Sequence, residues 1–396
     1  MSMGDLLVRD VRPMNAASSD VLVRDGRIHA IGPSLPAAAT AVVEEGHGAL
    51  LLPGFVEAHT HLDKTLWGMP WYRNDVGSRI TDRIENERRW RAATGHDAAA
   101  QSLALAQAFL ARGATRLRTH VDIDTDAGLK HLDGVLATRE SLRDRMDIQI
   151  VAFPQSGLLC RPGTAELLDQ ALRNGADVLG GLDPQDIDGD AVASLDVLFA
   201  LADRHAKPLD IHLHEGGLPG ANTLNLILDR VEALGMQGRL AISHCFCLGD
   251  VEAAERDRLL SRMARLRVAV ITTGSASRPG PQLPACRAAG VLVAGGNDGI
   301  RDTWTPYGMP DMLERAMLIG LRNNLRRDEE LGWALASVTA DAATVCGFAD
   351  YGLAPGCRAD FVLVQARNTE EAVVARPPRQ CVVAQGRVVA REGRLV

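Results

Sequence analysis

The stretch from Leu51 to Leu66 reads LLPGFVEAHTHLDKTL, and the interpretation of the whole chain starts from it. Its apolar residues lead directly into His59-Thr60-His61, a pattern typical of a buried strand with two histidines at its carboxyl end. Residues i and i+2 of a strand point to the same face, so both imidazoles can converge on one point. Neutral imidazoles are good ligands for Zn²⁺ or Fe²⁺. Such a pair also occurs as ordinary core or surface histidines, so the rest of the chain must decide.

Length and composition set the class of protein. The chain has 396 residues, 46% of them hydrophobic, which suits one large barrel with a small appendage. A formal net charge of −7 argues against nucleic acid or an anionic membrane as the main partner. We therefore expect a small-molecule substrate, no nucleic-acid or membrane partner, and a homo-oligomer of the chain.

Cysteine usage and the amino terminus favour a cytoplasmic location. The 7 cysteines are odd in number and scattered, unlike a disulfide framework. The start MSMGDLLVRDVRP has acidic residues where a secretory signal has a basic start and an apolar run. No apolar window approaches the ~18 residues of a membrane span. The expectation is a cytoplasmic protein.

Both ends of the chain show short alternating apolar runs broken by turn residues. The amino-terminal run DVLVRDGRIHAIG has a hairpin signal at Asp25-Gly26, and the carboxyl-terminal run CVVAQGRVVAREGRLV has one at Gln385-Gly386. Because chain termini tend to lie close together, we expect these ends to pair. The prediction is one small β-sandwich domain, with a first part at residues 1–54 and a second at residues 350–396.

The middle of the chain alternates apolar strands with amphipathic helices. The candidate strands are Gly54–His61, Arg116–Asp122, Ile148–Pro154, Val178–Asp183, Pro208–His214, Leu240–Cys245, Val268–Thr272 and Val291–Asp298. Intervening helices include 98–112 and 164–174, the latter closed by Gly175, and a last helix is expected at 309–325. This order predicts an α/β protein whose residues 55–349 form a (β/α)₈ TIM-type barrel.

Polar residues collect where these strands end, which is where such barrels build their active sites. The residues at the ends are His59, His61, His120, Asp122, Gln155, His212, His214, Glu215, His244 and Asp298. Three histidines with one carboxylate make a catalytic metal site that leaves a position for water. The predicted ligands of one divalent ion, Zn²⁺ or Fe²⁺, are His59, His61, His212 and Asp298. The ion would lower the pKa of its water toward ~7.

A second, lysine-bridged metal is excluded by sequence. Related barrels carry a carboxylated lysine on the fourth strand, and no lysine occurs here between Lys130 and Lys207. Lys64, three residues after His61, is interpreted as a loop or salt-bridge residue.

Two further residues are candidates for proton transfer. Glu215 lies three residues after His212, so it can pass a proton from the water to a ring nitrogen, provided that a closed pocket raises its pKa. His244 can hold the hydroxide in line. The alternatives are a surface glutamate at a helix start and an ordinary core histidine.

The remaining polar residues near these strands receive supporting roles. His214 is expected beside the ligands, with a rival role as ligand, and His120 and Asp122 are expected to orient a ligand or line the pocket. Cys245 and Cys247 lack a second cysteine pair and are interpreted as packing residues.

Six segments together resemble the cytosine deaminase branch of the amidohydrolase superfamily: PGFVEAHTHLDKT, RTHVDID, DIQIVAFPQSGLL, LDIHLHEGG, ISHC and GGNDGIRDTWTPYG. The resemblance covers essentially the full length. It implies one Fe²⁺ or Zn²⁺ on His59, His61, His212 and Asp298, with Glu215 protonating the ring, His244 polarising the hydroxide and Asp298 relaying a proton to ammonia. It also implies that Gln155 holds the amide edge of a pyrimidine and that Trp304 lines the pocket.

Two positions depart from that family pattern. Gly299 stands where the resembled deaminases carry a second aspartate, and His214 stands where they carry an acidic residue. We infer that Gly299 leaves space and removes a charge, so that either the pocket tolerates a ring substituent such as the methyl group of 5-methylcytosine or the substrate is one other than cytosine.

The leading hypothesis is a metal-dependent hydrolytic deaminase of an amino-substituted azaheterocycle. Cytosine or a 5-substituted cytosine such as 5-methylcytosine is the expected substrate, and ammonia the product. The alternative is the N-alkylaminotriazine branch (N-isopropylammelide type), which shares the HLDK after the first histidines and releases an alkylamine. A cyclic amide hydrolase and a non-catalytic scaffold are weaker alternatives, because the bridging lysine is missing and every metal ligand is kept.

Overall fold

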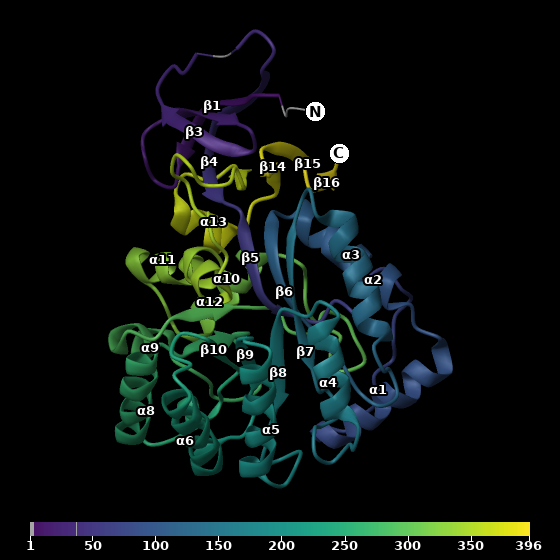
Figure 1. The fold of residues 1–396 in the computed structure, drawn as a ribbon. Helices are drawn as coiled ribbons and strands as arrows, with labels where there is room; N and C mark the ends of the chain where they lie inside the picture. Colours follow the sequence, from purple (N-terminus) through teal and green to yellow (C-terminus); the bar gives the residue numbers. More distant parts are fainter. Residues whose placement is uncertain (1–3, 37) are drawn as a thin grey trace.

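The computed structural model describes residues 4–36 and 38–396 and is built on two separate sheets (Figure 1). Residues 1–3 and 37 belong to the predicted first part of the small domain and lie outside the described residues. One sheet is the parallel barrel of the middle of the chain, and the other is formed by both chain ends. The expected fold class is confirmed.

The barrel sheet holds eight strands in sequence order, each parallel to its neighbours. They are β5 (Phe55–Thr60), β6 (Ala114–Asp122), β7 (Asp147–Phe153), β8 (Val178–Leu182), β9 (Leu209–His212), β10 (Leu240–Ser243), β11 (Ala269–Thr272) and β12 (Val293–Gly295). The ring closes just beyond β12, where Thr60 and Asp298 form a parallel bridge and the Asp298 N–H donates to the His59 carbonyl at 2.7 Å. The carboxyl ends of all eight strands therefore surround one site.

Helices surround the barrel sheet, as their amphipathic sequences predict (Figure 1). They are α1 (Ile80–Thr94), α2 (Ala98–Ala111), α3 (Lys130–Leu142), α4 (Thr164–Arg173), α5 (Ala191–Arg204), α6 (Gly217–Ala233), α7 (Cys247–Asp250), α8 (Ala253–Leu266), α9 (Leu283–Ala289), α10 (Met312–Arg322), α11 (Asp328–Ala336) and α12 (Ala340–Cys346). In α4, for example, Leu168, Ala171 and Leu172 share one buried face, and Gly175 follows the helix with a left-handed φ of 115°. None of the described helices is long and apolar enough to cross a membrane.

The second sheet joins the two chain ends above the barrel, where purple and yellow strands lie together in Figure 1. Its order is β16-β15-β14-β13-β4-β1-β2-β3, and α13 (Thr369–Ala375) follows β13. The strands are β1 (Leu6–Pro13), β2 (Ser19–Arg24), β3 (Arg27–Gly32), β4 (Val42–Pro53), β13 (Phe361–Val364), β14 (Arg379–Ala384), β15 (Arg387–Arg391) and β16 (Arg394–Leu395). The two predicted hairpin turns connect β2 to β3 and β14 to β15, with positive φ at both residues of each turn.

Gly54 connects the two sheets, because β4 runs through it directly into β5. A Cβ at this position would lie 2.4 Å from Thr115 Oγ1, so only glycine permits the approach of the chain to β6. The short passage fixes the amino-terminal end of β5 beside the second sheet, and His59 lies at the other end of the strand.

Candidate active site

Five imidazoles and one carboxylate meet at the carboxyl ends of the barrel strands. His59 is the centre of this histidine cluster, with ring centroids of His120, His212 and His244 at 4.1, 4.6 and 5.1 Å. Asp298 Oδ1 lies 3.1 Å from His61 Nε2 and 3.5 Å from His59 Nε2. The structure thus brings together the four predicted ligands, His59, His61, His212 and Asp298, and adds His120 and His244 beside them.

The protonation of His59 follows from a hydrogen-bond chain behind it. Arg118 donates to Asp210 Oδ2 at 2.9 Å, and the Ser243 hydroxyl donates to Asp210 Oδ1 at 2.6 Å. Because the Ser243 proton is used there, its oxygen must accept from His59 Nδ1, 2.8 Å away. Nδ1 therefore carries the proton, and Nε2 presents a lone pair toward Asp298.

The donor set fits a divalent cation. His59 Nε2 and Asp298 Oδ1 are both acceptors, and only a positive charge between them makes their 3.5 Å approach favourable. Within the described ranges, His59 Nε2, His244 Nε2 and both nitrogens of His212 are buried without a hydrogen-bond partner. Ligand atoms of these three histidines and Asp298 all lie within 4.8 Å of one another. This is the imidazole and carboxylate chemistry of a catalytic zinc or iron site.

Burial keeps the histidines in their metal-binding form. Desolvation, assisted by Lys64, lowers the pKa of His61 to about 4. It also holds the pKa values of His120, His212 and His244 well below the ordinary value. Their imidazoles are neutral at neutral pH, as ligation requires.

The backbone is strained where two of these side chains enter the site. His244 has φ 69° and Asp298 has φ 62°, a left-handed conformation that costs about 1–3 kcal/mol outside glycine. Asp298 is held in place because the Thr60 hydroxyl donates to its carbonyl at 3.1 Å. The closure of the barrel between Thr60 and Asp298 therefore positions the Asp298 carboxylate.

Glu57 holds the backbone of His59 and Asn297 where the barrel closes. This residue was not identified from the sequence. Its carboxylate accepts the His59 N–H at 2.8 Å and the Asn297 N–H at 3.1 Å, and Arg315 binds the Asn297 side-chain oxygen at 2.9 Å. Burial raises the pKa of Glu57 to about 7. A charged residue within the apolar run LLPGFVEAH was the available signal.

Glu215 is buried, with a relative exposure of 1%, so the alternative of a surface glutamate is wrong. Oε1 accepts the N–H groups of Gln185 and Asp186 at 2.8 and 3.2 Å, and Oε2 accepts the Thr223 hydroxyl. Burial raises the pKa of Glu215 in spite of these hydrogen bonds. The raised pKa makes the carboxyl group of Glu215 a better proton acceptor than an exposed glutamate.

His214 lies against His244 rather than among the ligand atoms. The two rings stack with centroids 4.3 Å apart, and His214 Nδ1 lies 2.7 Å from Asp183 Oδ2. Burial would lower the pKa of His214, but the Asp183 charge and hydrogen bond raise it. A charged His214 under His244 disfavours protonation of His244 and so keeps that ring neutral.

The expected substrate residues Gln155 and Trp304 meet at Lys64. Lys64 Nζ donates to Gln155 Oε1 and to Asp122 Oδ1, the latter at 3.3 Å, and lies 5.4 Å from the centre of the Trp304 ring. Glu87 of α1 accepts the Trp304 indole N–H and lies 3.7 Å from Nζ. Lys64 is thus a salt-bridge residue, as expected, and it also contacts both predicted substrate residues.

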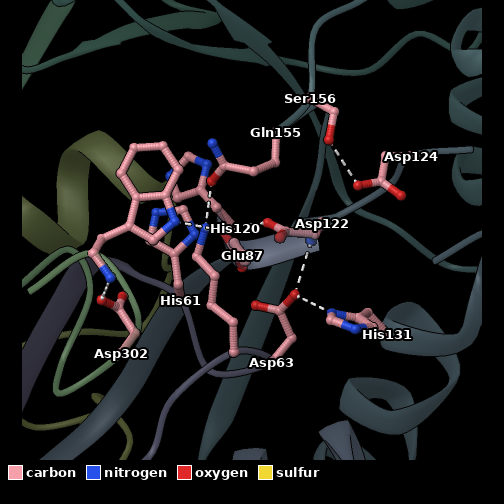
Figure 2. A network of polar contacts seen from close by, with 12 residues as sticks. His61, Asp63, Glu87, His120, Asp122, Asp124, His131, Gln155, Ser156 and Asp302 are labelled. Carbon is pink, nitrogen blue, oxygen red and sulfur yellow. Dashed lines mark hydrogen bonds and ion pairs between the residues drawn. The ribbon is translucent and has the colours of Figure 1, made fainter. Parts of the chain in front are cut away.

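An ion network holds this side of the site, and Figure 2 shows Asp63 directed toward His131 and Ser156 directed toward Asp124. Arg91 of α1 bridges Asp122 at 3.0 Å and Asp124 at 2.7 Å, while Asp63 pairs with His131 at 2.7 Å. Asp122 therefore belongs to this network, and one of its oxygens also lies within 4.8 Å of a His61 nitrogen. The residues of α1 were not identified from sequence, because that helix lacks a strong apolar face.

The interpretation of Gly299 is corrected by the structure. A Cβ on Gly299 would lie 2.0 Å from Asp302 Oδ2, so the missing side chain leaves no open space. Asp302 also supplies a carboxyl group there, and burial raises its pKa to about 7. The inferred tolerance for a ring substituent at this point is wrong, because the chain fills the space from three residues further along.

Comparison with known proteins places this geometry in a family. The sequence pattern of the amidohydrolase family matches residues 45–390. A crystal structure of N-isopropylammelide isopropylaminohydrolase from Burkholderia multivorans ATCC 17616 is 62% identical, with a TM-score of 0.97 and full coverage of both chains. N-isopropylammelide isopropyl amidohydrolase of Pseudomonas sp. (strain ADP) is 30% identical over 359 residues, 88% of each chain.

A 5-methylcytosine deaminase from Klebsiella pneumoniae, liganded with 5-fluorocytosine, is also similar, with 27% identity, a TM-score of 0.85 and 97% coverage of both chains. The resemblance inferred from the six motifs is therefore confirmed, with both branches among the relatives. The chain belongs to the amidohydrolase family and is a metal-dependent hydrolase acting on C–N bonds.

Proposed function

We propose that the protein hydrolyses the exocyclic C–N bond of an N-alkylamino-substituted azine ring and releases an alkylamine. The observation that carries this proposal is the 62% identity over the full length to N-isopropylammelide isopropylaminohydrolase. The 5-methylcytosine deaminase is only 27% identical. Alkylamine release, the alternative at the level of sequence, is therefore better supported than release of ammonia from cytosine.

The histidine cluster would hold one divalent ion, Zn²⁺ or Fe²⁺, through His59, His61, His212 and Asp298. Such an ion supplies a Lewis acid that makes water nucleophilic at neutral pH. His59 Nε2 and the nitrogens of the neutral His212 are buried without a hydrogen-bond partner, so a lone pair of each ring is available to such an ion. Arg118, Asp210 and Ser243 fix the orientation of His59.

The proton transfers of the proposed reaction fall to Glu215 and Asp298. Water adds to the ring carbon that carries the alkylamino group, and Glu215 passes a proton to the neighbouring ring nitrogen. The C–N bond then breaks, and the alkylamine leaves with a proton relayed by Asp298. A raised pKa suits Glu215 to this exchange, and the neutral His244 can orient the water through its Nε2.

The test is a product assay on protein loaded with Zn²⁺ or Fe²⁺. N-isopropylammelide and 5-methylcytosine are supplied separately, and isopropylamine and ammonia are measured by chromatography. We expect isopropylamine from the first compound and little ammonia from the second, with chelator-treated protein as the control. A higher kcat/KM for ammonia release from 5-methylcytosine would overturn the proposal and favour the deaminase branch.

A further inference from the structure

Arg315 of α10 is a buried arginine beside the closure of the barrel. It is only 8% exposed, and within the described residues its guanidinium donates to two neutral oxygens. Nε and Nη2 donate to Asn297 Oδ1 at 3.3 and 2.9 Å, and Nη1 donates to the Thr273 carbonyl. Arginine is seldom this buried unless it is paired. The role of Arg315 therefore depends on what Asn297 holds in place.

Asn297 connects Arg315 to Glu57. Its Nδ2 donates to Glu57 Oε2 at 2.5 Å, while its Oδ1 accepts from Arg315. The amide has one favourable orientation here, because the reversed amide would place its NH₂ group against the guanidinium. The backbone N–H of Asn297 also donates to Glu57, at 3.1 Å. Residue 297 is thus held through both its side chain and its backbone.

The same carboxyl group of Glu57 holds the strand that carries the histidines. Oε1 accepts the His59 N–H at 2.8 Å, so one side chain joins β5 at His59 to the chain that follows β12. The two segments lie very close together. A Cβ on Gly296 would be 2.5 Å from His59 Cβ and 2.7 Å from the His59 nitrogen, an approach that only glycine permits.

Asp298 follows Asn297 directly and has a strained backbone, with φ 62°. A residue in this region persists only where its surroundings over-determine it. Thr60 and the His59 carbonyl hold Asp298 itself, and the linked side chains of Arg315, Asn297 and Glu57, here called the Arg315 chain, hold the residue before it. The Asp298 carboxylate is thereby kept 3.5 Å from His59 Nε2.

We propose that Arg315 and Asn297 are positioning residues for the metal site, which act through Glu57 to set the Asp298 carboxylate against His59 before a metal ion binds. The inference deepens the proposed function and rests on the ligands named there. An ion that finds its carboxylate and imidazole ligands already together does not have to order them, so its affinity is higher. The Arg315 chain thus connects α10 to the site.

Arg315→Met tests the proposal, because it removes the anchor of the chain and keeps a side chain of similar length. We expect Zn²⁺ affinity to fall by about tenfold or more, the range for loss of a group that orients a ligand. The sign is informative, since removal of a nearby positive charge would by itself make a cation bind more tightly. Competition against a chromophoric chelator measures the affinity, and thermal unfolding of the metal-free protein measures stability. Affinity equal to or above that of the parent would overturn the proposal.

Asn297→Leu breaks the Arg315 chain at its centre without changing the net charge, and it should lower Zn²⁺ affinity by a similar factor. Because both residues act through one chain, the double variant Arg315→Met with Asn297→Leu should bind Zn²⁺ about as well as the weaker single variant. The double variant also leaves no guanidinium against an apolar side chain, so it can fold where a single variant does not. Parent affinity in the folded double variant, or losses of binding free energy that simply add, would overturn the proposal.

Arg116→Met is the matched control. Arg116 is 1% exposed and also donates to two carbonyls, those of Ala349 and Asp350. It pairs in register with Asp147, the first residue of β7, at the end of the barrel opposite the site. We expect this variant to unfold at a lower temperature and to keep the Zn²⁺ affinity of the parent. An equal loss of affinity in Arg116→Met would assign the effect to general destabilisation and overturn the proposal.

Failure of the proposed function gives a different result. A parent protein that binds Zn²⁺ but releases no isopropylamine from N-isopropylammelide would contradict the alkylamine reaction and leave the role of Arg315 and Asn297 standing. Release of isopropylamine by the parent, with unchanged Zn²⁺ affinity in the variants, would contradict only the positioning role.

Discussion

Ser243→Ala removes the link that orients His59 while leaving every proposed ligand in place. Ser243 Oγ accepts from His59 Nδ1 at 2.8 Å and donates to Asp210 Oδ1 at 2.6 Å, and all three side chains are buried. In the alanine variant the Nδ1 proton has no partner. The neutral imidazole can then move its proton to Nε2, where it would oppose metal binding.

The size of the effect follows from this loss. Replacing a partner that orients a ligating histidine costs ~10–100-fold in metal affinity, which corresponds to ~1.4–2.8 kcal/mol. Asp210 keeps its bond from Arg118 at 2.9 Å, so the fold should lose only the ~1–3 kcal/mol of an unsatisfied buried group. Metal affinity should therefore fall in a protein that is still folded.

The assay is competition for Zn²⁺ against a chromophoric chelator, with thermal unfolding of the metal-free protein measured in parallel. Ser337→Ala is the matched control, because Ser337 is as buried as Ser243. Its hydroxyl donates to the carbonyl of Ala334 in α11, the helix that ends just before it. We expect that control to bind Zn²⁺ as the parent does. If Ser243→Ala retains the parent affinity within about twofold, the assignment of the His59 proton is refuted.

Three further substitutions have defined outcomes. Glu215→Gln should lower kcat by ~10²–10⁴ at unchanged metal content, and turnover within tenfold of the parent would exclude a role in proton transfer. Asp302→Asn keeps the oxygen that accepts two N–H bonds at 2.8 Å and removes a carboxyl group whose pKa is raised by burial to about 7. Because the folded form holds this proton more tightly than the unfolded form, the parent loses stability as pH rises from about 4 through about 7. The variant should therefore gain up to ~4 kcal/mol over the parent across that range in denaturant unfolding, and a pH-independent difference would contradict the assignment. Gly299→Ala should destabilise the fold by ~1–3 kcal/mol, because the new methyl group would contact Asp302. The control is Gly332→Ala in α11, where a Cβ meets nothing within 4 Å, and this change should be neutral or stabilising. Equal unfolding midpoints of the two variants would refute the close contact at Gly299.

The barrel was predictable because each strand is an unbroken apolar run with polar residues at one end. The structure places the runs that lead to His59, His120 and His212 on β5, β6 and β9 of one parallel sheet. The meeting of His59, His61, His212 and Asp298 was predictable because parallel strands bring their carboxyl ends to one edge. The pairing of the chain ends also followed, from two hairpin signals on opposite termini.

The residues that surround Lys64 and Gly299 were harder to predict because their positions depend on tertiary contacts without a local pattern. Glu87 reaches Lys64 from α1, of which only Ile84 and Glu87 are buried. Asp302 fills the space beside Gly299 through a turn that sequence alone does not define. The choice between alkylamine and ammonia release was equally hidden, since the histidine motifs are shared by both branches. The HLDK that ends in Lys64 pointed toward the N-alkylaminotriazine branch but did not by itself decide the choice.

The proposed binding residues and the proposed proton-transfer residues follow different strands of the barrel. Lys64 follows β5 and Gln155 follows β7, whereas Glu215 follows β9 and His244 follows β10. Under the proposed function, Gln155 would contact the ring and Glu215 would act at the carbon that carries the alkylamino group. Changes at Gln155 should appear mainly in KM, and changes at Glu215 in kcat, because the first contact is made equally in ground and transition states and the second is not.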